Sequence, residues 1–296
     1  MQPRDLAIYL FLAVTWGLSF LVLLQVVQAF DWAGAVALRS LVASFTLLGL
    51  ARLLGRRVEI RAHRRHLLVL GATTVAGQLI GLSYATPRIG TAMAAIFVAA
   101  IPLFSMLIGR LWGLEKIRAQ GVVGLLLGLL GLLLMVGFPA VTIDRTFILG
   151  CLASLGGALC GAFGSNYAAL HLRGVAPWSV TAGAFLFGGL LVLPLLLVVP
   201  IPRLPTLSDV AFLLLSGSGM SALTYVLYFG LVARIGATRT ISVEFVITVI
   251  AVMVGAGVLG EPLSWLQYLG ASTILAGCAL VLGLWPGSRR RTAAVE

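Results

Sequence analysis

The chain has 296 residues, of which 60% are hydrophobic and 10% are charged, and its formal net charge is +11. Soluble domains average about 25% charged residues, so this composition excludes a water-soluble protein and indicates several membrane spans. Apolar runs this continuous lack the alternation of a porin strand, so we expect an all-α polytopic membrane protein.

Ten apolar segments are long enough to cross a membrane. A bilayer core about 30 Å thick needs about 20 apolar residues per helix. In chain order, the segments are 6–26, 32–51, 67–86, 90–110, 118–138, 147–170, 178–199, 208–232, 236–257 and 265–285. No Gly-x-x-x-x-Gly-Lys-[Ser/Thr] signature occurs, so no ATP-driven transport and no ATPase subunit are implied.

Lysine and arginine are distributed unevenly between the two sides of the membrane. With the N-terminus in the cytoplasm, sixteen of them fall inside, three fall outside, and Arg39 lies within a span. Cytoplasmic loops carry such an excess, so we expect a bacterial inner membrane protein with both termini in the cytoplasm. The basic charge is then a topology signal, and no nucleic-acid partner is expected.

A stretch near the C-terminus repeats an earlier one. Residues 234–277 align without a gap on residues 88–131, which lie 146 positions earlier. The informative matches are an arginine, a glutamate and four glycines: Arg88 with Arg234, Glu115 with Glu261, Gly90 with Gly236, Gly109 with Gly255, Gly124 with Gly270, and Gly131 with Gly277. We interpret the whole chain as one duplicated unit.

Because the unit holds an odd number of spans, the second copy must enter the membrane upside down. The predicted fold therefore has ten transmembrane helices in two inverted five-helix repeats around a central cavity, as in secondary transporters. The first repeat is expected over residues 1–140 and the second over 147–285, with a basic cytoplasmic tail at 286–296.

Several short motifs fall at characteristic places in these spans. Trp16-Gly17 lies in the first helix, Arg39 in the second, Pro102 in the fourth, and Glu115 precedes a glycine-rich fifth helix. With Gly90 opening the fourth helix, this pattern resembles the EamA type of the drug/metabolite transporter superfamily, over essentially all ten helices. Within it the chain is most similar to the bacterial aromatic amino-acid exporters.

The second repeat departs from this pattern. Ala162-Phe163 stand where Trp-Gly would fall, and Thr248 stands where proline would. The resemblance implies a basket of helices whose cavity is lined mainly by helices 1, 3, 4, 6, 8 and 9, and export driven by the substrate gradient or by proton exchange. The departures argue against a symmetric site.

Arg39 and Glu244 are the charged residues expected well inside spans, where each costs several kcal/mol unless it is paired or hydrated. From the helical rise, Arg39 lies about 10 Å below the outer face and Glu244 about 12 Å above the inner face, so a direct or water-bridged pair is within reach. Glu244 is interpreted as a proton site or an anchor for a substrate ammonium group. The alternatives are a structural ion pair with Arg39 and a local pair with Arg239.

A substrate site should be mostly apolar with a few placed polar groups. Ser221, Thr224, Tyr225 and Tyr228 have the spacing of one helix face. Such a lining suits a small zwitterion with an apolar side chain, although interhelical hydrogen bonding would place polar residues similarly. The predicted cavity residues are Trp16, Ser19, Gln78, Tyr84, Met93, Phe97, Asn166, Tyr167, Tyr225, Tyr228, Ser242 and Glu244, with Arg39 as charge partner.

Pro102 is predicted to be a hinge between inward-open and outward-open states, because proline removes a backbone hydrogen bond. An enzyme is not expected, since His63, His66 and His171 lie in loops or at helix ends and no catalytic motif occurs. No cofactor or metal is expected. The predicted function is export of small neutral or aromatic amino acids by a monomer or homodimer, and the alternative is efflux of lipophilic organic cations.

Overall fold

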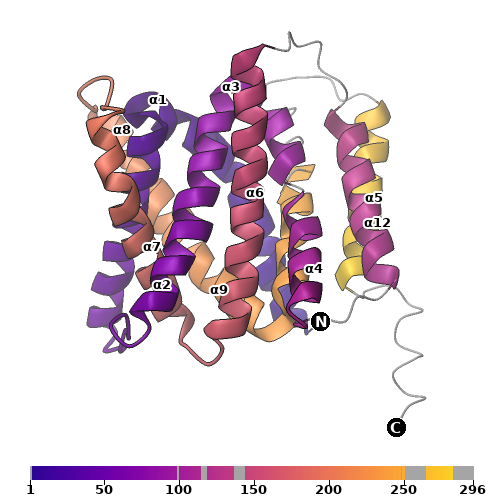
Figure 1. Ribbon diagram of the computed structural model, residues 1–296, viewed down its shortest axis with the longest axis horizontal. Helices are drawn as coiled ribbons and strands as arrows, with labels where there is room; N and C mark the ends of the chain where they lie inside the picture. The colour runs from indigo at the N-terminus through magenta and orange to yellow at the C-terminus, as the bar shows by residue number, and fades with distance from the viewer. Residues whose placement is uncertain are drawn as a thin grey trace.

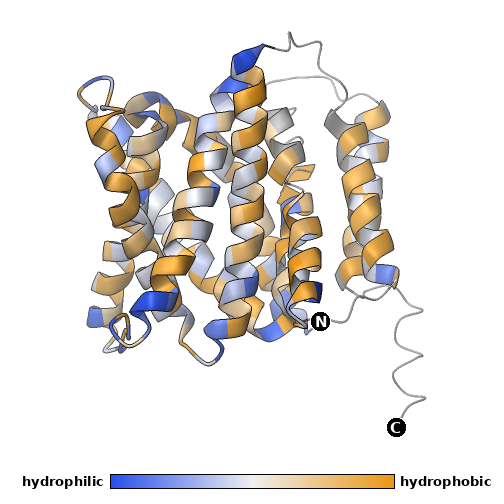
Figure 2. Ribbon diagram, viewed as in Figure 1, coloured by the Kyte–Doolittle hydropathy of each residue, from blue (hydrophilic) through white to orange (hydrophobic). Residues whose placement is uncertain are grey.

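The computed structural model describes residues 2–98, 100–114, 119–136, 144–247, 249–250 and 265–282, and the regular elements of this part are helices. They run side by side as a bundle, with the N-terminus at its lower end (Figure 1). Hydrophobic residues cover the middle of the helices, and hydrophilic residues gather toward their ends (Figure 2). This banding is typical of a protein surrounded by lipid.

Five helical stretches in the described residues are long and apolar enough to cross a membrane, and three shorter apolar helices accompany them. The five are Leu21–Leu53, Arg64–Ile89, Arg145–His171, Pro177–Leu197 and Leu207–Ile235. The shorter ones are Ile101–Leu111, Ala119–Gly131 and Tyr268–Val281. Residues 248 and 251–257 of the predicted span 236–257, and the tail at 286–296, lie outside the described residues.

The first helix, α1, extends over Pro3–Leu53, with a single non-helical residue, Asp31, at φ 58° and ψ 171°. The indole N–H of Trp16 donates to Thr224 Oγ1, while Arg39 Nε donates to Ser221 Oγ. In a straight helix, residues 16 and 39 would stand about 35 Å apart, so they could not both reach one short segment. The chain therefore reverses at Asp31, between the predicted spans 6–26 and 32–51.

The next helical run comprises α2 (Arg64–Leu70), a π-helical segment (Gly71–Gly77) and α3 (Gln78–Val98), and α4 follows over Ile101–Leu111. Where we expect a loop, at 87–89, the backbone is still helical and Pro87 lies inside α3. The chain nevertheless reverses in this region. Thr74 packs against Gly164, and Ser105 accepts a hydrogen bond from Asn166, so both contact the same part of α6. In one straight helix, residues 74 and 105 would be too far apart to do so.

Helices also make up the rest of the described chain. They are α5 (Ala119–Val136), α6 (Arg145–His171), α7 (Pro177–Val192) with a 3₁₀ turn at Leu193–Leu197, α8 (Leu207–Leu214), a π-helical segment (Leu215–Leu223), α9 (Thr224–Ile235), α10 (Ala237–Ile241) and α12 (Trp265–Leu282).

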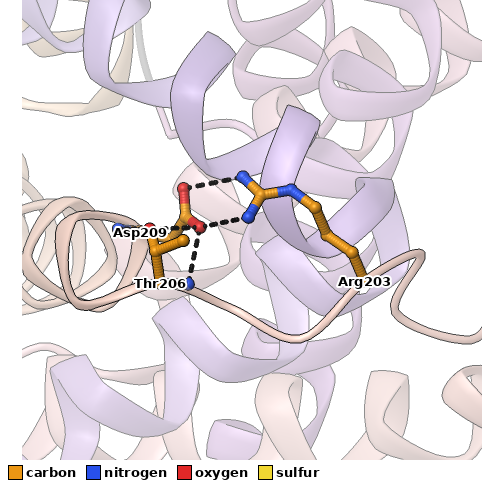
Figure 3. A network of polar contacts seen from close by, with 3 residues as sticks. All are labelled: Arg203, Thr206 and Asp209. Carbon is orange, nitrogen blue, oxygen red and sulfur yellow. Dashed lines mark hydrogen bonds and ion pairs between the residues drawn. The ribbon is translucent and has the colours of Figure 1, made fainter.

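A polar network fixes the start of α8 (Figure 3). Thr206 Oγ1 accepts from the Asp209 backbone N–H, and Asp209 Oδ2 accepts from the Thr206 backbone N–H. This capping box satisfies backbone donors that a helix start leaves unpaired. Arg203 adds an ion pair of 2.8 Å to the Asp209 carboxylate.

The two π-helical segments end at positions separated by the offset found in the sequence. The first π-helical segment ends at Gly77 and the second at Leu223, 146 positions later. Local backbone irregularity is therefore repeated together with the sequence.

Close contacts between the halves are also repeated. A Cβ on Gly71 would lie 2.7 Å from the backbone N of Gly188, and one on Gly217 would lie 2.5 Å from Val42. Gly217 and Val42 lie 146 positions from Gly71 and Gly188, in exchanged halves. The same exchange relates two crossings of α5 with α12, at Gly124 against Gly277 and at Gly131 against Gly270.

Candidate functional site

A central cavity lies among the helices of both halves. The space that the centres of water molecules can occupy in it is about 60 Å³. One water molecule needs about 10–15 Å³ of such space, so the cavity has room for several. Its lining residues are Trp16, Ser19, Leu23, Arg39, Gln78, Leu79, Leu82, Val98, Ile101, Ser154, Gly157, Ala158, Tyr225, Glu244 and Ile247.

Six of the residues predicted from the sequence come together here, from five helical stretches far apart in the chain: Trp16, Ser19, Arg39, Gln78, Tyr225 and Glu244. They include both charged residues assigned to spans. The two charges of opposite sign therefore line one cavity.

Trp16 lines the cavity, and its indole N–H is bonded to the second half of the chain. The indole Nε1 donates to the carbonyl of Met220 at 3.2 Å and to Thr224 Oγ1 at 3.0 Å. The ring packs against Tyr225 and Tyr228, with centroids 5.1 and 5.5 Å away. Aromatic pairs at this spacing are favourable, and here they fix one wall of the cavity.

Arg39 is held by the second π-helical segment. Its Nε donates to Ser221 Oγ at 2.8 Å, and Ser221 Oγ donates to the carbonyl of Ser216 at 2.8 Å. The five-residue spacing between Ser216 and Ser221 belongs to the widened turn of a π-helix, which is often found at functional sites. One of the five guanidinium N–H groups is used in this way, which orients the remaining four.

Glu244 lies just after a break in the helix that leads into it. α10 ends at Ile241, Ser242 is in a turn, and helical backbone resumes at residues 243–247. Glu244 is half-buried and faces the same cavity as Arg39. Interrupted helices at the midplane are a recurring way to build transporter sites.

The apolar part of the lining was not assigned from the sequence. Leu79 and Leu82 come from α3, Ile101 comes from α4, and Ala158 comes from α6. Spans as hydrophobic as these are apolar on every face, so hydrophobic periodicity does not distinguish a cavity wall from a lipid-facing surface. Ser154 also lines the cavity and was likewise missed.

The predicted polar stripe of α9 and the segment before it is buried and divides between two roles. Ser221 and Thr224 bond side chains of the first half, Arg39 and Trp16. Tyr228 shares a hydrogen bond of 2.7 Å with Ser165. Only Tyr225 of this stripe lines the cavity. Interhelical bonding, the alternative reading of the stripe, accounts for the other three.

A set of buried polar residues, here called the polar belt, links the helices below the cavity. Tyr9 OH and Ser242 Oγ share a bond of 3.0 Å, and Asn166 Nδ2 donates to Ser105 Oγ at 2.9 Å. Each member is at most 6% exposed. The belt comprises Tyr9, Ser105, Ser165, Asn166, Tyr228, Thr238 and Ser242.

The belt lies between the cavity and the end of the bundle that holds the N-terminus. Tyr9 precedes Trp16 by seven residues in α1, which is about 10 Å at 1.5 Å per residue. Beyond it, at the same end, Arg234 Nε donates to Asp5 Oδ1 at 2.8 Å. Polar contacts therefore join the helices of both halves at this end.

The other predicted site residues lie away from the cavity lining. Tyr84 packs edge-on against Trp32, with the Arg88 guanidinium 3.6 Å from its ring centroid. Tyr167 shares a 2.8 Å bond with His66. The rest fall in three places: Phe97 in an apolar cluster with Ala85 and Ile89, Asn166 and Ser242 in the polar belt, and Pro102 buried in the first turn of α4. The side chain of Met93 lies outside the described residues.

In the part of the chain that the structure describes, no three His, Cys, Asp or Glu side chains gather closely enough to hold a metal ion. The chemistry available in the cavity is recognition by charge, hydrogen bonds and aromatic rings.

Comparison with known proteins gives whole-length matches. The chain matches the EamA-like transporter family over residues 5–137 and again over 148–283. It is 27% identical over 281 residues to YedA of Escherichia coli, named as an inner membrane transporter, covering 91% of this chain and 88% of YedA. Protein PecM of Dickeya dadantii is 25% identical over 295 residues, which is 98% of this chain and 96% of PecM. A solved crystal structure with 17% identity shares the fold, at a TM-score of 0.79 over 96% of this chain and 99% of that one.

Proposed function

Because the chain belongs to the EamA-like transporter family, we propose that it is a secondary transporter that exports small neutral or aromatic amino acids and related metabolites by alternating access. The family and the membrane-length helices make it a multi-pass membrane protein with a small-molecule substrate. The observation that carries the choice of substrate is the central cavity, which is lined by Arg39, Glu244 and the rings of Trp16 and Tyr225.

Two inverted five-helix repeats are the proposed architecture. The family matches the chain twice, over ranges of similar length. Contacts such as Gly71 with Gly188 and Gly217 with Val42 join one half to the other and recur with the halves exchanged. Reciprocal contacts of this kind are the mark of a two-fold arrangement. In secondary transporters such an axis lies in the membrane plane, and the substrate binds between the repeats.

Alternating access would use a difference between the two halves. Ser165 and Tyr228 are bonded in the polar belt, whereas the equivalent residues 146 positions earlier, Ser19 and Leu82, cannot form such a bond and both line the central cavity. The positive-inside distribution of lysine and arginine predicts that the belt lies toward the cytoplasm. We take the belt as the closure at that end, which opens when the bond between Ser165 and Tyr228 breaks.

A steric block tests whether the central cavity is the path. Ala158, 2% exposed, lines the cavity on α6, so Ala158→Trp should fill it and abolish transport. Gly156 on the same helix is exposed, with open space around its Cβ position, so Gly156→Trp is the matched control. Counterflow into proteoliposomes would be measured for threonine, methionine, phenylalanine, tryptophan and one organic dication.

Exchange of amino acids by the wild type and by Gly156→Trp, but not by Ala158→Trp, is the expected result. Exchange of the dication alone would assign the chain to the efflux of lipophilic cations instead. Amino-acid exchange that survives in Ala158→Trp would show that the central cavity is not the path.

A further inference from the structure

We propose that Arg39 and Glu244 are the two charged poles of the central cavity, Arg39 binding the carboxylate of a zwitterionic substrate and Glu244 its ammonium group. This inference rests on the proposed function and adds the orientation in which the substrate is held. It also explains how the cavity would reject molecules that carry only one of the two charges.

Charge complementarity is the first argument. Both side chains line one cavity within the membrane-spanning part of the chain. An α-amino acid carries one charge of each sign, so it can make a charged contact with both poles at once. An amine or a carboxylic acid alone can make a charged contact with only one of them. Discrimination against single-charge analogues therefore follows from the lining itself.

The anchoring of Arg39 supplies the geometry for a carboxylate. Its Nε bond to Ser221, itself fixed to the Ser216 carbonyl, holds the guanidinium from one edge. A guanidinium held in this way presents its other N–H groups as a planar fork, which matches the two oxygens of a carboxylate. Lysine has the charge without the fork, so it is a partial substitute.

The poles are not repeated by the internal duplication. Moving Arg39 forward by 146 positions gives Phe185, which is fully buried. Moving Glu244 back by the same offset gives Val98, which lines the cavity without a charge. The cavity consequently has one positive and one negative pole, on opposite halves of the chain, and a zwitterion fits in one orientation only.

The lining between the poles favours an apolar substrate side chain. Leu79, Leu82 and Ile101 form an aliphatic wall, and the rings of Trp16 and Tyr225 form an aromatic one. Binding sites of this kind are mostly apolar, with a few polar groups that fix orientation. The α-carbon of the substrate would lie between the poles, with its side chain against these walls.

Counterflow of three matched compounds tests the assignment: phenylalanine, phenethylamine, which lacks the carboxylate, and 3-phenylpropionate, which lacks the ammonium group. The wild type should exchange phenylalanine at least about 10-fold faster than either analogue, since each charged contact is worth about 1.5–3 kcal/mol. In Arg39→Gln, the preference for phenylalanine over phenethylamine should disappear, while the preference over 3-phenylpropionate remains. Glu244→Gln should show the converse.

Conservative variants and a surface control separate binding from folding. Arg39→Lys and Glu244→Asp retain the charges and should retain the preferences in part. Arg203→Gln neutralises an arginine outside the cavity, in an ion pair with Asp209, and should leave both preferences unchanged. Thermal unfolding of each purified variant measures any loss of the folded state.

The outcomes distinguish this inference from the proposed function. If the wild type exchanges no amino acid, both are overturned. If the wild type exchanges phenylalanine and the Gln variants lower the exchange rates of all three compounds by the same factor, the proposed function stands and Arg39 and Glu244 are structural charges only. A preference that changes for the wrong analogue would reverse the orientation and overturn the assignment.

Discussion

The bond between Ser165 and Tyr228 gives a quantitative prediction for the polar belt. The two oxygens are 2.7 Å apart, and the residues are 1% and 5% exposed. In Tyr228→Phe the Ser165 hydroxyl stays buried in the closed state without this partner, at a cost of about 1–3 kcal/mol. In the state open to the cytoplasm, water replaces the partner and the cost disappears. The closed-to-open ratio should therefore fall about 5- to 150-fold.

The assay is labelling of a single cysteine in the central cavity. Cys151, Cys160 and Cys278 are replaced by alanine, and Ala158→Cys supplies the reporter. A membrane-impermeant thiol reagent added to the cytoplasmic face of inside-out vesicles should label Tyr228→Phe faster than the parent, in proportion to the shift.

A double variant provides the control. Ser165→Ala combined with Tyr228→Phe removes both partners, so no buried hydroxyl is left unpaired and only the net value of one bond, about 0.5–1.5 kcal/mol, is lost. Its labelling rate should lie between those of the parent and of Tyr228→Phe. Equal rates in all three proteins, or faster labelling from the opposite face, would refute the assignment of the belt as the cytoplasmic closure.

Three further predictions concern stability. Gly277→Val should lower the thermal unfolding temperature strongly, because its Cβ would lie 2.5 Å from the carbonyl oxygen of Gly124, whereas Gly121→Val has open space and should change it little. Asp31→Gly should raise the unfolding temperature, since φ 58° with ψ 171° costs a residue with a Cβ about 1–3 kcal/mol, and an unchanged or lower value would contradict this. Asp209→Asn should lose about 1 kcal/mol from the helix cap without altering transport, as measured by unfolding and counterflow together.

The membrane-length helices could be predicted from the sequence because they depend on long, strongly apolar runs, and the family because its motifs, such as Trp16-Gly17, stand at fixed places in those runs. A spacing of 146 residues predicts a duplication, and the ends of the two π-helical segments have the same spacing. Arg39 and Glu244 could be named in advance because a charge inside a span is costly wherever the helix faces. Both line the cavity.

The direction in which uncharged polar residues face could not be predicted. Asn166 and Ser242 were expected in the cavity, yet Asn166 donates to Ser105, 61 positions earlier, and Ser242 bonds Tyr9. Either orientation satisfies their hydrogen bonds, and the choice is made by packing between helices distant in sequence. For the same reason, Leu79 and Val98 could not be told from the many lipid-facing residues of the chain.

Trp16 ties the wall of the cavity to the opposite half of the chain. Its indole N–H is shared by the Met220 carbonyl and the Thr224 hydroxyl, so a shift of its helix against α9 must turn or release the ring. A carrier that collects cargo at low concentration and unloads it elsewhere needs unequal dissociation constants at its two faces. A ring whose hydrogen bonds change with the conformation gives two different dissociation constants from a single set of residues. The cargo then biases which face the loaded carrier presents, by no more than that difference in affinity.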